Sequence, residues 1–405
     1  MNIKEKKIAI VGGGMGGLTL GYLLAKKGNK VTILEKEKNL GGLMAGFKMN
    51  GVNLEQTYHH FFKTDKDLIK LIKEIGLIRD ISWCKSSVGL YWNKKMYPFV
   101  TAMDLLRFKP LGLMDKLKMG MVAIWLKLDK NWQKYETITA DKWMRKMVGK
   151  RAYKVIWQPL LQGKFHDFYK KVSMAWLWAR IHTRGNSTNK KGEEVLGYID
   201  GGFEKIIEKL AKLIKKNGGK IKLKTEIKNL VFLEKEYDVI VDTRPAKGID
   251  YLGAIDVVFE SKQNLSQYYW HNINDVNSPF VAVVQQTNLI DKKNYGNKEI
   301  YYLGSYLPQD HEFFGKSDKE IIKVWFDYLK KIFPEFDKKM VGKMFIFRFK
   351  YAQHIVTTSY AKKIPPIKIS DKIYQMNFAQ IYPEDRGINY AVKEAQKIAK
   401  IIAES

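Results

Sequence analysis

The sequence contains a single cysteine among 405 residues. Because Cys84 has no second thiol to pair with, no disulfide can form within the chain. Long apolar runs are missing as well, since the best stretch, 119–128, is interrupted by Lys127. Such a run is too short and too polar to predict a transmembrane helix. The chain passes directly into its first expected strand, so we expect no signal peptide and a cytoplasmic location.

Acidic residues and arginine are both scarce beside lysine. The chain carries 71 lysine and arginine residues against 42 acidic ones, for a formal charge of +29, and only nine of the 71 are arginine. Surfaces that bind nucleic acid usually favour arginine and exposed aromatic rings, so no nucleic-acid partner is expected. No metal is expected either, because His59 and His60 are the only close histidine pair and adjacent residues rarely chelate one ion.

Glycines are concentrated near the N-terminus, where residues 8–18 read IAIVGGGMGGL. Gly12, Gly14 and Gly17 fit the G-x-G-x-x-G spacing between an apolar strand and a helix that bind a dinucleotide. Gly12 permits the tight turn, Gly14 lets the backbone approach a pyrophosphate, and Gly17 lets helix and strand pack closely. The helix N-terminus offers free N–H groups to the phosphates. Glu35 lies about 20 residues on, where a carboxylate can accept hydrogen bonds from ribose hydroxyls.

A second glycine pair indicates which dinucleotide is bound. Gly41 and Gly42 follow the second expected strand, in the stretch NLGGLMAGF. Such a pair allows a second backbone segment to close over the pyrophosphate, as a larger and more deeply held dinucleotide needs. The pair therefore favours FAD over NAD, with a flexible loop as the alternative interpretation.

Four stretches together resemble the superfamily of FAD-dependent amine oxidases, protoporphyrinogen oxidases and phytoene desaturases. They are VGGGMGGL with Glu35, NLGGLMAGF, YIDGGFEKIIEKL at 198–210 and YPEDRGINYAVKEAQKIA at 382–399. A further segment, 157–181, is similar to the protoporphyrinogen-oxidase-type segment that crosses the substrate domain. The resemblance implies an α/β fold. A Rossmann-type FAD-binding domain, glutathione-reductase-like and of the amine oxidase type, would be interleaved with an α+β substrate domain.

The resemblance and the hydrophobic pattern agree on this interleaving. The FAD-binding domain is expected to comprise 1–60, 190–245 and 355–405, and the substrate domain 61–189 and 246–354. The first part of the substrate domain is expected to be helical, with Thr139 and Ser173 as N-caps, over 65–75, 103–107, 113–128, 140–148, 151–163 and 173–182. Its second part is expected to be a mixed sheet with strands 280–286, 299–306 and 344–352 and a helix 319–332. The polar stretch 184–194 is expected to be a mobile crossing loop.

The C-terminal motif is expected to hold the flavin end of FAD. The resemblance places the isoalloxazine ring near Gly387, Ile388 and Asn389, at the start of a helix expected over 388–402. A helix N-terminus is a positive dipole end that suits the negative charge of a reduced flavin, and Arg386 could add a full charge.

Two features depart from the family pattern. The strand expected before this helix, 372–378, ends without the usual glycine, and Asn377 can substitute because it tolerates a left-handed conformation. Ile227 matches the position whose backbone meets adenine in the family. It lies at the start of an expected strand, and residues 234–237 connect that strand to the next one. The family's meander is shortened there. The expected FAD contacts are Gly12, Gly14, Met15, Gly16, Gly17, Glu35, Lys36, Gly41, Gly42, Leu43, Ile227, Arg386, Gly387, Ile388 and Asn389.

Five polar or aromatic residues are candidates for catalysis. His59 and His60 follow the segment that leads into the pocket in the family, so one of them could relay a proton or contact a substrate oxygen. Lys164 could anchor a substrate carboxylate or phosphate. The resemblance places Tyr351 facing the flavin, and Gln353 could hydrogen-bond the substrate or the flavin. For each of them, an ordinary structural role is the alternative.

Together these features predict an FAD-dependent oxidoreductase. The enzyme would remove hydride from a C–H beside nitrogen or an extended π system of an apolar or aromatic small molecule, and oxygen, a quinone or another carrier would accept the electrons. FAD would be non-covalent, because Cys84 is distant in sequence from the flavin motif. A non-redox flavoenzyme like UDP-galactopyranose mutase, acting on a nucleotide sugar, is the first alternative. The second is a non-catalytic FAD-binding partner at a membrane.

The stretch 104–132 interleaves Leu, Met, Ile and Trp with Lys, which is typical of a helix at a membrane interface. A peripheral contact with the inner face of the membrane through this stretch is therefore one interpretation. An ordinary substrate-domain helix is the alternative interpretation.

Overall fold

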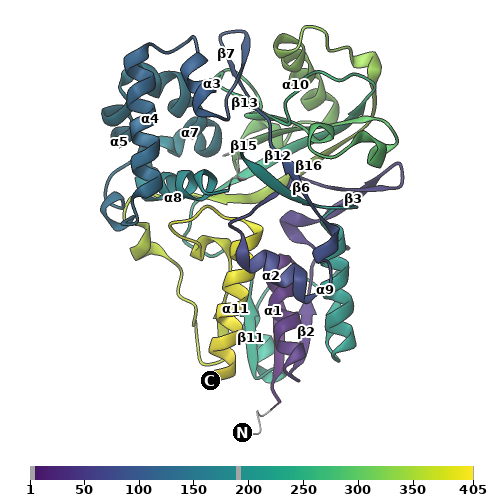
Figure 1. Ribbon diagram of the computed structural model, residues 1–405. Coiled ribbons are helices and arrows are strands. Elements are labelled where there is room, and N and C mark those ends of the chain that lie inside the picture. The colour runs from purple at the N-terminus through teal and green to yellow at the C-terminus, as the bar shows by residue number, and fades with distance from the viewer. Residues whose placement is uncertain (1–4, 188–192, 405) are drawn as a thin grey trace.

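We describe the fold from a computed structural model that covers residues 5–187 and 193–404 (Figure 1). The boundary expected at 189/190 and five of the eleven residues of the crossing loop expected at 184–194 lie outside these residues. The division into two interleaved domains stays an interpretation of the sequence.

A parallel sheet of five strands forms the lower half of the molecule in Figure 1, in the order β10-β2-β1-β11-β17. Its three central strands are nearly continuous apolar runs, as expected for a parallel sheet that is covered on both faces. They come from three separate parts of the chain: β1 (Lys7–Val11), β2 (Lys30–Leu34), β10 (Lys220–Lys222), β11 (Val239–Asp242) and β17 (Ile373–Gln375).

Helices pack along this sheet. α1 (Met15–Lys26) begins directly after β1 and contacts both α9 (Glu204–Lys216) and α11 (Ile388–Glu404). α2 (Lys66–Glu74) also packs on α11. The expected C-terminal helix is confirmed, and Val392, Ala395 and Ala399, spaced three and four residues apart, are buried on one face of it.

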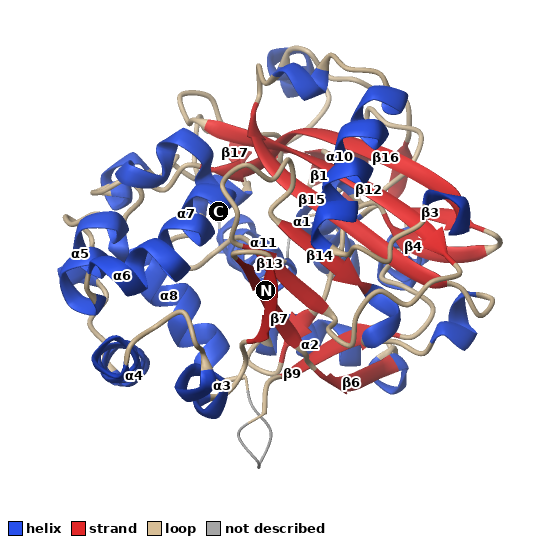
Figure 2. Cartoon of the chain, turned by 90° about the horizontal axis from the view of Figure 1, so that it is seen from above, coloured by secondary structure: helices blue, strands red, loops and turns tan. Residues whose placement is uncertain are grey.

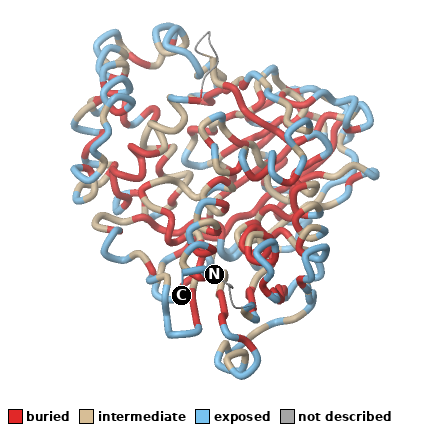
Figure 3. Tube along the Cα trace, turned by 60° about the horizontal axis from the view of Figure 1, so that its bottom comes forward, coloured by how far each residue is buried: buried red, intermediate tan, exposed pale blue. Residues whose placement is uncertain are grey.

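A second sheet of seven strands lies above the first, in the order β16-β12-β15-β14-β13-β7-β8. All neighbouring strands are antiparallel except β13 and β7. Its middle strands are buried, and Figure 3 shows in red all the buried parts of the chain. The strands are β7 (Val88–Trp92), β8 (Lys95–Pro98), β12 (Tyr251–Ser261), β13 (Trp270–Ile273), β14 (Ala282–Gln285), β15 (Glu299–Pro308) and β16 (Val341–His354), and α10 (Asp318–Ile332) packs beside them.

The remaining helices gather on one side of this sheet and form a helical lobe (Figure 2). Thr139 and Ser173 cap two of them, as the sequence predicts, because each hydroxyl accepts a hydrogen bond from a backbone N–H of the first turn. The helix expected over 151–163 is divided by a π-helical turn at Tyr153–Trp157. The helices of the lobe are α3 (Ala102–Arg107), α4 (Leu113–Leu128), α5 (Ala140–Val148), α6 (Lys150–Ala152), α7 (Gln158–Phe165) and α8 (Met174–Gly185).

Two small sheets connect these layers: a hairpin of β3 (Gly46–Met49) with β4 (Val52–Glu55), and a sheet in the order β5-β9-β6. The second of these joins Phe61–Phe62, Val195–Ile199 and Ile81–Lys85. The segment 61–189, whose helices were expected, thus also contains strands that were not, because β5, β6, β7 and β8 all lie in it.

The strand expected to start at Ile227 is absent from the described chain. Ile227 lies in an irregular loop after β10, and a 3-10 helix follows at Leu230–Lys235. The Asn229 side chain caps that helix by accepting a hydrogen bond from Val231 N–H at 3.0 Å. A side chain that hydrogen-bonds a nearby backbone N–H in this way favours a turn over a strand. The apolar pattern of the sequence did not indicate this turn.

Candidate functional site

A large cavity, 2370 Å³ in volume, is lined by residues of the parallel sheet, the helical lobe and the seven-stranded sheet. All fifteen residues that the sequence predicts as FAD contacts line it. So do four of the five catalytic candidates, His59, His60, Lys164 and Tyr351. Sequence motifs that are hundreds of residues apart thus meet in one space.

The first glycine turn is fixed by close contacts of its own. Gly12 has a φ of +112°, and a Cβ on it would lie 2.2 Å from Thr243 Oγ1. A Cβ on Gly17 would lie 2.1 Å from the Gly12 carbonyl oxygen. Gly14 differs, because a Cβ there would meet no atom closer than 4.0 Å. The space over Gly14, at the N-terminus of α1, is the room that a phosphate group would need.

The second glycine segment lies directly against the first. Gly41 N–H donates to the Gly13 carbonyl oxygen at 2.9 Å, and Gly41 and Gly42 both adopt positive φ angles, of +114° and +57°. Two backbone segments therefore face the cavity side by side, as the glycine pair predicts. This double cradle fits a diphosphate, because its polar groups are backbone groups and no side chain fills it.

Glu35 follows β2 and is held rigidly at the cavity edge. Its carboxylate accepts hydrogen bonds from Gly13 N–H at 2.6 Å and from Glu37 N–H at 2.8 Å. The side chain is buried. A carboxylate oxygen has more than one acceptor site, so Glu35 can still accept from a ligand hydroxyl.

Ile227 is positioned by a residue that the sequence did not indicate. Arg244 donates two hydrogen bonds to the Asp242 carboxylate, at 2.8 Å from Nε and 2.9 Å from Nη2, and its Nη1 donates to the Ile227 carbonyl oxygen. This fork joins the end of β11 to the loop that carries Ile227. The planar guanidinium makes the connection stiff.

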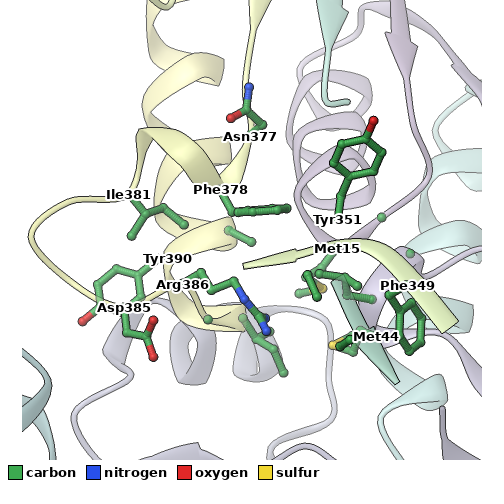
Figure 4. Close-up of a pocket in the computed structure, with 18 of the residues that line it drawn as sticks. Met15, Met44, Phe349, Tyr351, Asn377, Phe378, Ile381, Asp385, Arg386 and Tyr390 are labelled. Carbon is green, nitrogen blue, oxygen red and sulfur yellow. The ribbon is translucent and has the colours of Figure 1, made fainter. Parts of the chain in front are cut away.

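The C-terminal side of the cavity is dominated by Arg386. In Figure 4 its guanidinium points into the space in front of Met15 and Met44, whereas Asp385 points away from that space. Arg386 Nη2 donates to Tyr306 Oη at 3.0 Å. Its Nε is buried and has no hydrogen-bond partner within the described chain. An unpaired cationic donor of this kind fits an acceptor atom on a bound ligand.

Asn389 and Asn377 stabilise this end through their side chains. Asn389 Oδ1 accepts from Leu68 N–H at 3.0 Å and so ties α11 to α2. Asn377 has a φ of −149°, so the left-handed conformation considered for it is not adopted. Its Oδ1 accepts from Ala379 N–H at 3.0 Å and caps a short 3-10 helix instead.

A buried cluster of charges surrounds Asp385. Its carboxylate accepts from Lys164 Nζ at 3.0 Å, from Trp176 Nε1 at 3.1 Å and from Arg180 Nη1. Burial alone would raise the pKa of Asp385, but the surrounding cations outweigh it and hold that pKa below its ordinary value. One carboxylate thus faces three cations, counting Arg386, and the cluster carries an excess of positive charge.

Tyr306 lies between two of these cations. Lys164 Nζ is 4.9 Å from the centre of its ring, and the Arg386 guanidinium is 5.8 Å from it. Burial would raise the pKa of Tyr306, but Lys164 and Arg386 lower it below its ordinary value. The sequence does not single out Tyr306, because an aromatic residue on an alternating strand is typical of a core.

His59 and His60 are held in their neutral forms. Burial lowers the pKa of His59 to about 4 and that of His60 to about 3. His59 Nδ1 lies 2.8 Å from the Thr57 carbonyl oxygen, and His60 Nδ1 lies 3.0 Å from Tyr269 Oη. Neutral imidazoles can accept or donate a hydrogen bond to a ligand but bring no charge to it.

The two candidates on β16 lie differently with respect to the cavity. Gln353 is fully buried and does not line the cavity, and its amide donates to the neighbouring His354 carbonyl oxygen at 3.0 Å. A direct contact of Gln353 with a ligand in this cavity is therefore not supported. Tyr351 lines the cavity, but it is half exposed, its ring packs on Tyr251, and Figure 4 shows it pointing away from Arg386.

Asp256 is a further cavity residue that sequence analysis missed. It lies on β12 opposite Gly304 of β15 and is buried, with one carboxylate oxygen that lacks a partner in the described chain. Burial raises its pKa to about 7. No local signal identifies Asp256, because its strand is apolar on both sides. A carboxyl group that titrates near neutrality in a cavity is a candidate acid or base.

Within residues 5–187 and 193–404, no group of three or more His, Cys, Asp and Glu side chains could hold a metal ion. No helix of this part of the chain combines the length and the hydropathy that are needed to cross a bilayer. Cys84 lies on β6 and does not line the cavity.

Comparison with known sequences identifies relatives of this chain. The profile of the family described as flavin containing amine oxidoreductase matches residues 15–252, more than half of the chain. An uncharacterized protein of Methanocaldococcus jannaschii is 27% identical over 257 residues, or 58% of this chain and 57% of the relative. The 15-cis-phytoene desaturase of Capsicum annuum is 24% identical over 422 residues, or 89% of this chain and 70% of that enzyme. The chain thus spans little more than half the length of the first relative.

Solved structures share the whole architecture. A protein from Exiguobacterium sp. 255-15, provisionally described as a protoporphyrinogen oxidase, has a TM-score of 0.75 at 17% identity over 100% of both chains. A reduced UDP-galactopyranose mutase has a TM-score of 0.72 at 11% identity over 99% of this chain and 94% of that one. At such identities the likeness establishes the fold alone. The predicted α/β fold class is thereby confirmed.

Proposed function

Because this chain belongs to the family of flavin-containing amine oxidoreductases, we propose that it is an oxidoreductase that binds FAD non-covalently. Its reaction would be removal of hydride from a C–H beside nitrogen or beside an extended π system. The observation that carries the proposal is the single cavity in which the glycine cradle and the Arg386 end of the chain meet.

The geometry of the cavity supports FAD as the cofactor. The double glycine cradle would hold the diphosphate, Glu35 the ribose, and the loop of Ile227 the adenine. Gly387, Ile388 and Asn389, at the start of α11, would lie near the flavin ring. Cys84, the one cysteine of the chain, does not line the cavity. Its position supports non-covalent binding of FAD.

The chemistry that FAD supplies when bound is acceptance of hydride, and the chain would supply a dry and correctly charged environment for it. Trp157 and Trp176 line the wall of the cavity, which suits a flat or elongated apolar substrate. Lys164 and Tyr306 would orient a polar group on such a substrate. His59 and His60, being neutral, would serve as hydrogen-bond partners, and Asp256 is the group best placed by its pKa to hold or release a proton near neutral pH.

A second candidate function has a specific observation in its favour. The cluster of Lys164, Arg180 and Arg386 around the single carboxylate of Asp385 leaves positive charge in the cavity. Such charge would suit the phosphates of a nucleotide sugar, as in a non-redox enzyme like UDP-galactopyranose mutase. A non-catalytic FAD-binding partner at a membrane is the remaining alternative.

The proposal includes partners of two kinds. One is the small-molecule substrate, and the other is an electron acceptor such as oxygen, a quinone or another carrier. A peripheral contact with the inner face of a membrane through 104–132 also belongs to the proposal, because an apolar substrate would partition into a bilayer.

Spectroscopy of the purified protein tests the cofactor first. We expect flavin absorbance bands, and release of FAD rather than FMN when the protein is denatured. Gly14→Ala protein, whose cradle is obstructed, serves as the matched blank. Colourless protein that takes up neither flavin nucleotide would overturn the proposal.

Anaerobic titration then tests the reaction. Addition of candidate amines, porphyrinogens or polyenes should bleach the flavin band if one of them is a substrate. Turnover of a nucleotide sugar that requires prior chemical reduction would support the mutase alternative instead. If neither class reacts, the non-catalytic alternative gains support.

A further inference from the structure

The outer surface of α3 and α4 is apolar. Ten of the 21 large apolar side chains that are exposed in the described chain lie within residues 100–128. Figures 1 and 2 show α3 and α4 side by side at the edge of the helical lobe. The ten are Val100, Met103, Leu106, Leu113, Met114, Leu117, Met121, Ile124, Trp125 and Leu128, and we call them the α3–α4 face.

The buried and exposed positions of α4 show that the α3–α4 face is separate from the hydrophobic core of the lobe. Met119, Val122 and Leu126 are buried and attach the helix to the lobe. A surface helix attached in this way normally presents polar residues on its other side. Here the other side is apolar too, and Leu113 and Leu128 at its two ends are each 70% exposed. An apolar face of this extent marks a surface that binds something.

The charges around this face are mainly positive. Residues 100–134 contain seven basic and three acidic side chains. All three acids already have backbone or ionic partners: Asp104 and Asp115 accept from N–H groups at helix starts, and Asp129 pairs with Lys134 at 2.5 Å. Lysines that surround an apolar face match a layer with anionic headgroups above hydrocarbon.

The cavity reaches the same face. Ala123, Ile124 and Lys127 of α4 line it, and so does Val100 before α3. Ile124 and Val100 are also members of the α3–α4 face. Whatever covers the face therefore lies next to one wall of the cavity.

We propose that the α3–α4 face docks on an anionic phospholipid surface. A second copy of the chain is a poorer occupant, because a self-complementary contact would bring like-charged lysines together on a chain of charge +29. If the proposed function is correct, docking also sets the cavity wall formed by α4 against the bilayer, so that an apolar substrate can reach the cavity without crossing water. The docking proposal itself depends only on the α3–α4 face and not on the proposed function.

Flotation with vesicles tests the docking. Vesicles of phosphatidylcholine with phosphatidylglycerol should bind the purified protein at low salt, and vesicles of phosphatidylcholine alone should bind it much less. The variant Leu117→Ser/Met121→Ser/Leu128→Ser should lower the bound fraction about tenfold or more, since these side chains enter the hydrocarbon. The matched control Phe232→Ser/Val276→Ser changes exposed apolar residues elsewhere and should leave binding unchanged.

Trp125 supplies a local readout. Vesicles that contain a brominated phosphatidylcholine should quench part of the tryptophan fluorescence, and Trp125→Phe should remove that part. Flavin content, measured on the same samples, shows separately whether the proposed cofactor is present. The docking proposal is overturned if wild-type protein ignores anionic vesicles, if the control loses binding as much as the triple variant, or if light scattering shows that the face forms a dimer instead.

Discussion

Lys164 Nζ lies 3.0 Å from Asp385 Oδ2, although the two residues are 221 positions apart in the chain. Lys164 belongs to α7 of the helical lobe, and Asp385 lies just before α11, which packs on the helices of the parallel sheet. Both side chains are largely buried, with 14% and 13% of their surface exposed. This ion pair therefore connects the two halves of the molecule at the wall of the cavity.

Replacing Asp385 with Asn should destabilise the protein strongly. The change leaves Lys164, Arg180 and Arg386 close together in a buried place without a compensating charge. Removal of one partner of a buried pair typically costs about 3–5 kcal/mol, so the free energy of unfolding should fall by that order. Urea denaturation at neutral pH measures it.

The exposed pair of Lys368 and Asp371 offers a matched control, because Asp371→Asn removes the same charge where water replaces it. The pH dependence adds a second check. Since the folded-state pKa of Asp385 is depressed, its stabilisation is present above the unfolded-state pKa and disappears as pH falls through the folded-state value. The difference between wild type and Asp385→Asn should therefore shrink in acid, and a difference that is constant with pH would contradict the account.

Gly14→Ala should separate folding from cofactor binding. A Cβ at this position meets no protein atom closer than 4.0 Å, so the fold should tolerate it, but the methyl group would project into the space reserved for phosphate. We expect the flavin absorbance per protein to fall at least about tenfold with little change in the melting temperature of flavin-free protein. Gly120→Ala, in α4 with open space around it, is the control. Full flavin content in Gly14→Ala protein would refute the proposed cradle.

The sequence predicts the two ends of the cavity because each depends on local geometry. Gly12, Gly41 and Gly42 adopt positive φ angles that glycine favours, and α11 buries the stripe that its spacing indicates. These signals can be recognised without knowing the rest of the fold. Ile227 lines the cavity although the strand expected around it does not form, and its contact with adenine stays a prediction.

The residues in the middle of the cavity could not be predicted, because their roles depend on contacts with residues that are far away in sequence. Tyr306 looks like any aromatic residue of a buried strand until Arg386, 80 residues later, donates to its hydroxyl. Asp256 belongs to β12, which is buried along all eleven residues and so shows no alternation of polar and apolar positions. The burial of the Asp256 carboxyl group in such a strand becomes visible only in the structure.

Asp256→Asn should remove a pH dependence of stability near neutrality. Burial raises the folded-state pKa of Asp256 to about 7, so the folded state favours the protonated carboxyl. Its contribution to stability is full below the unfolded-state pKa near 4 and is lost as pH rises through about 7. Wild-type stability should therefore fall by about 2–4 kcal/mol from this group between pH 4 and pH 8, and the neutral Asn should not show this loss. Denaturation curves at pH 5, 6.5 and 8 give the comparison, and equal slopes for both proteins would exclude the assignment.

Arg244→Lys should weaken the hold on the adenine half of FAD and leave the flavin half unaffected. Arg244 connects the Asp242 carboxylate to the Ile227 carbonyl oxygen through a planar fork, and a lysine ammonium cannot make both contacts with the same rigidity. FMN lacks the adenine nucleotide, so its affinity reports only the flavin end. We therefore expect the dissociation constant for FAD to rise about tenfold, or about 1.4 kcal/mol, while that for FMN stays within about twofold. Titration of flavin-free protein with each nucleotide, followed by flavin fluorescence, measures both constants. A parallel loss of FMN affinity would show that Arg244 supports the fold as a whole, and unchanged affinity for both would place the adenine away from Ile227.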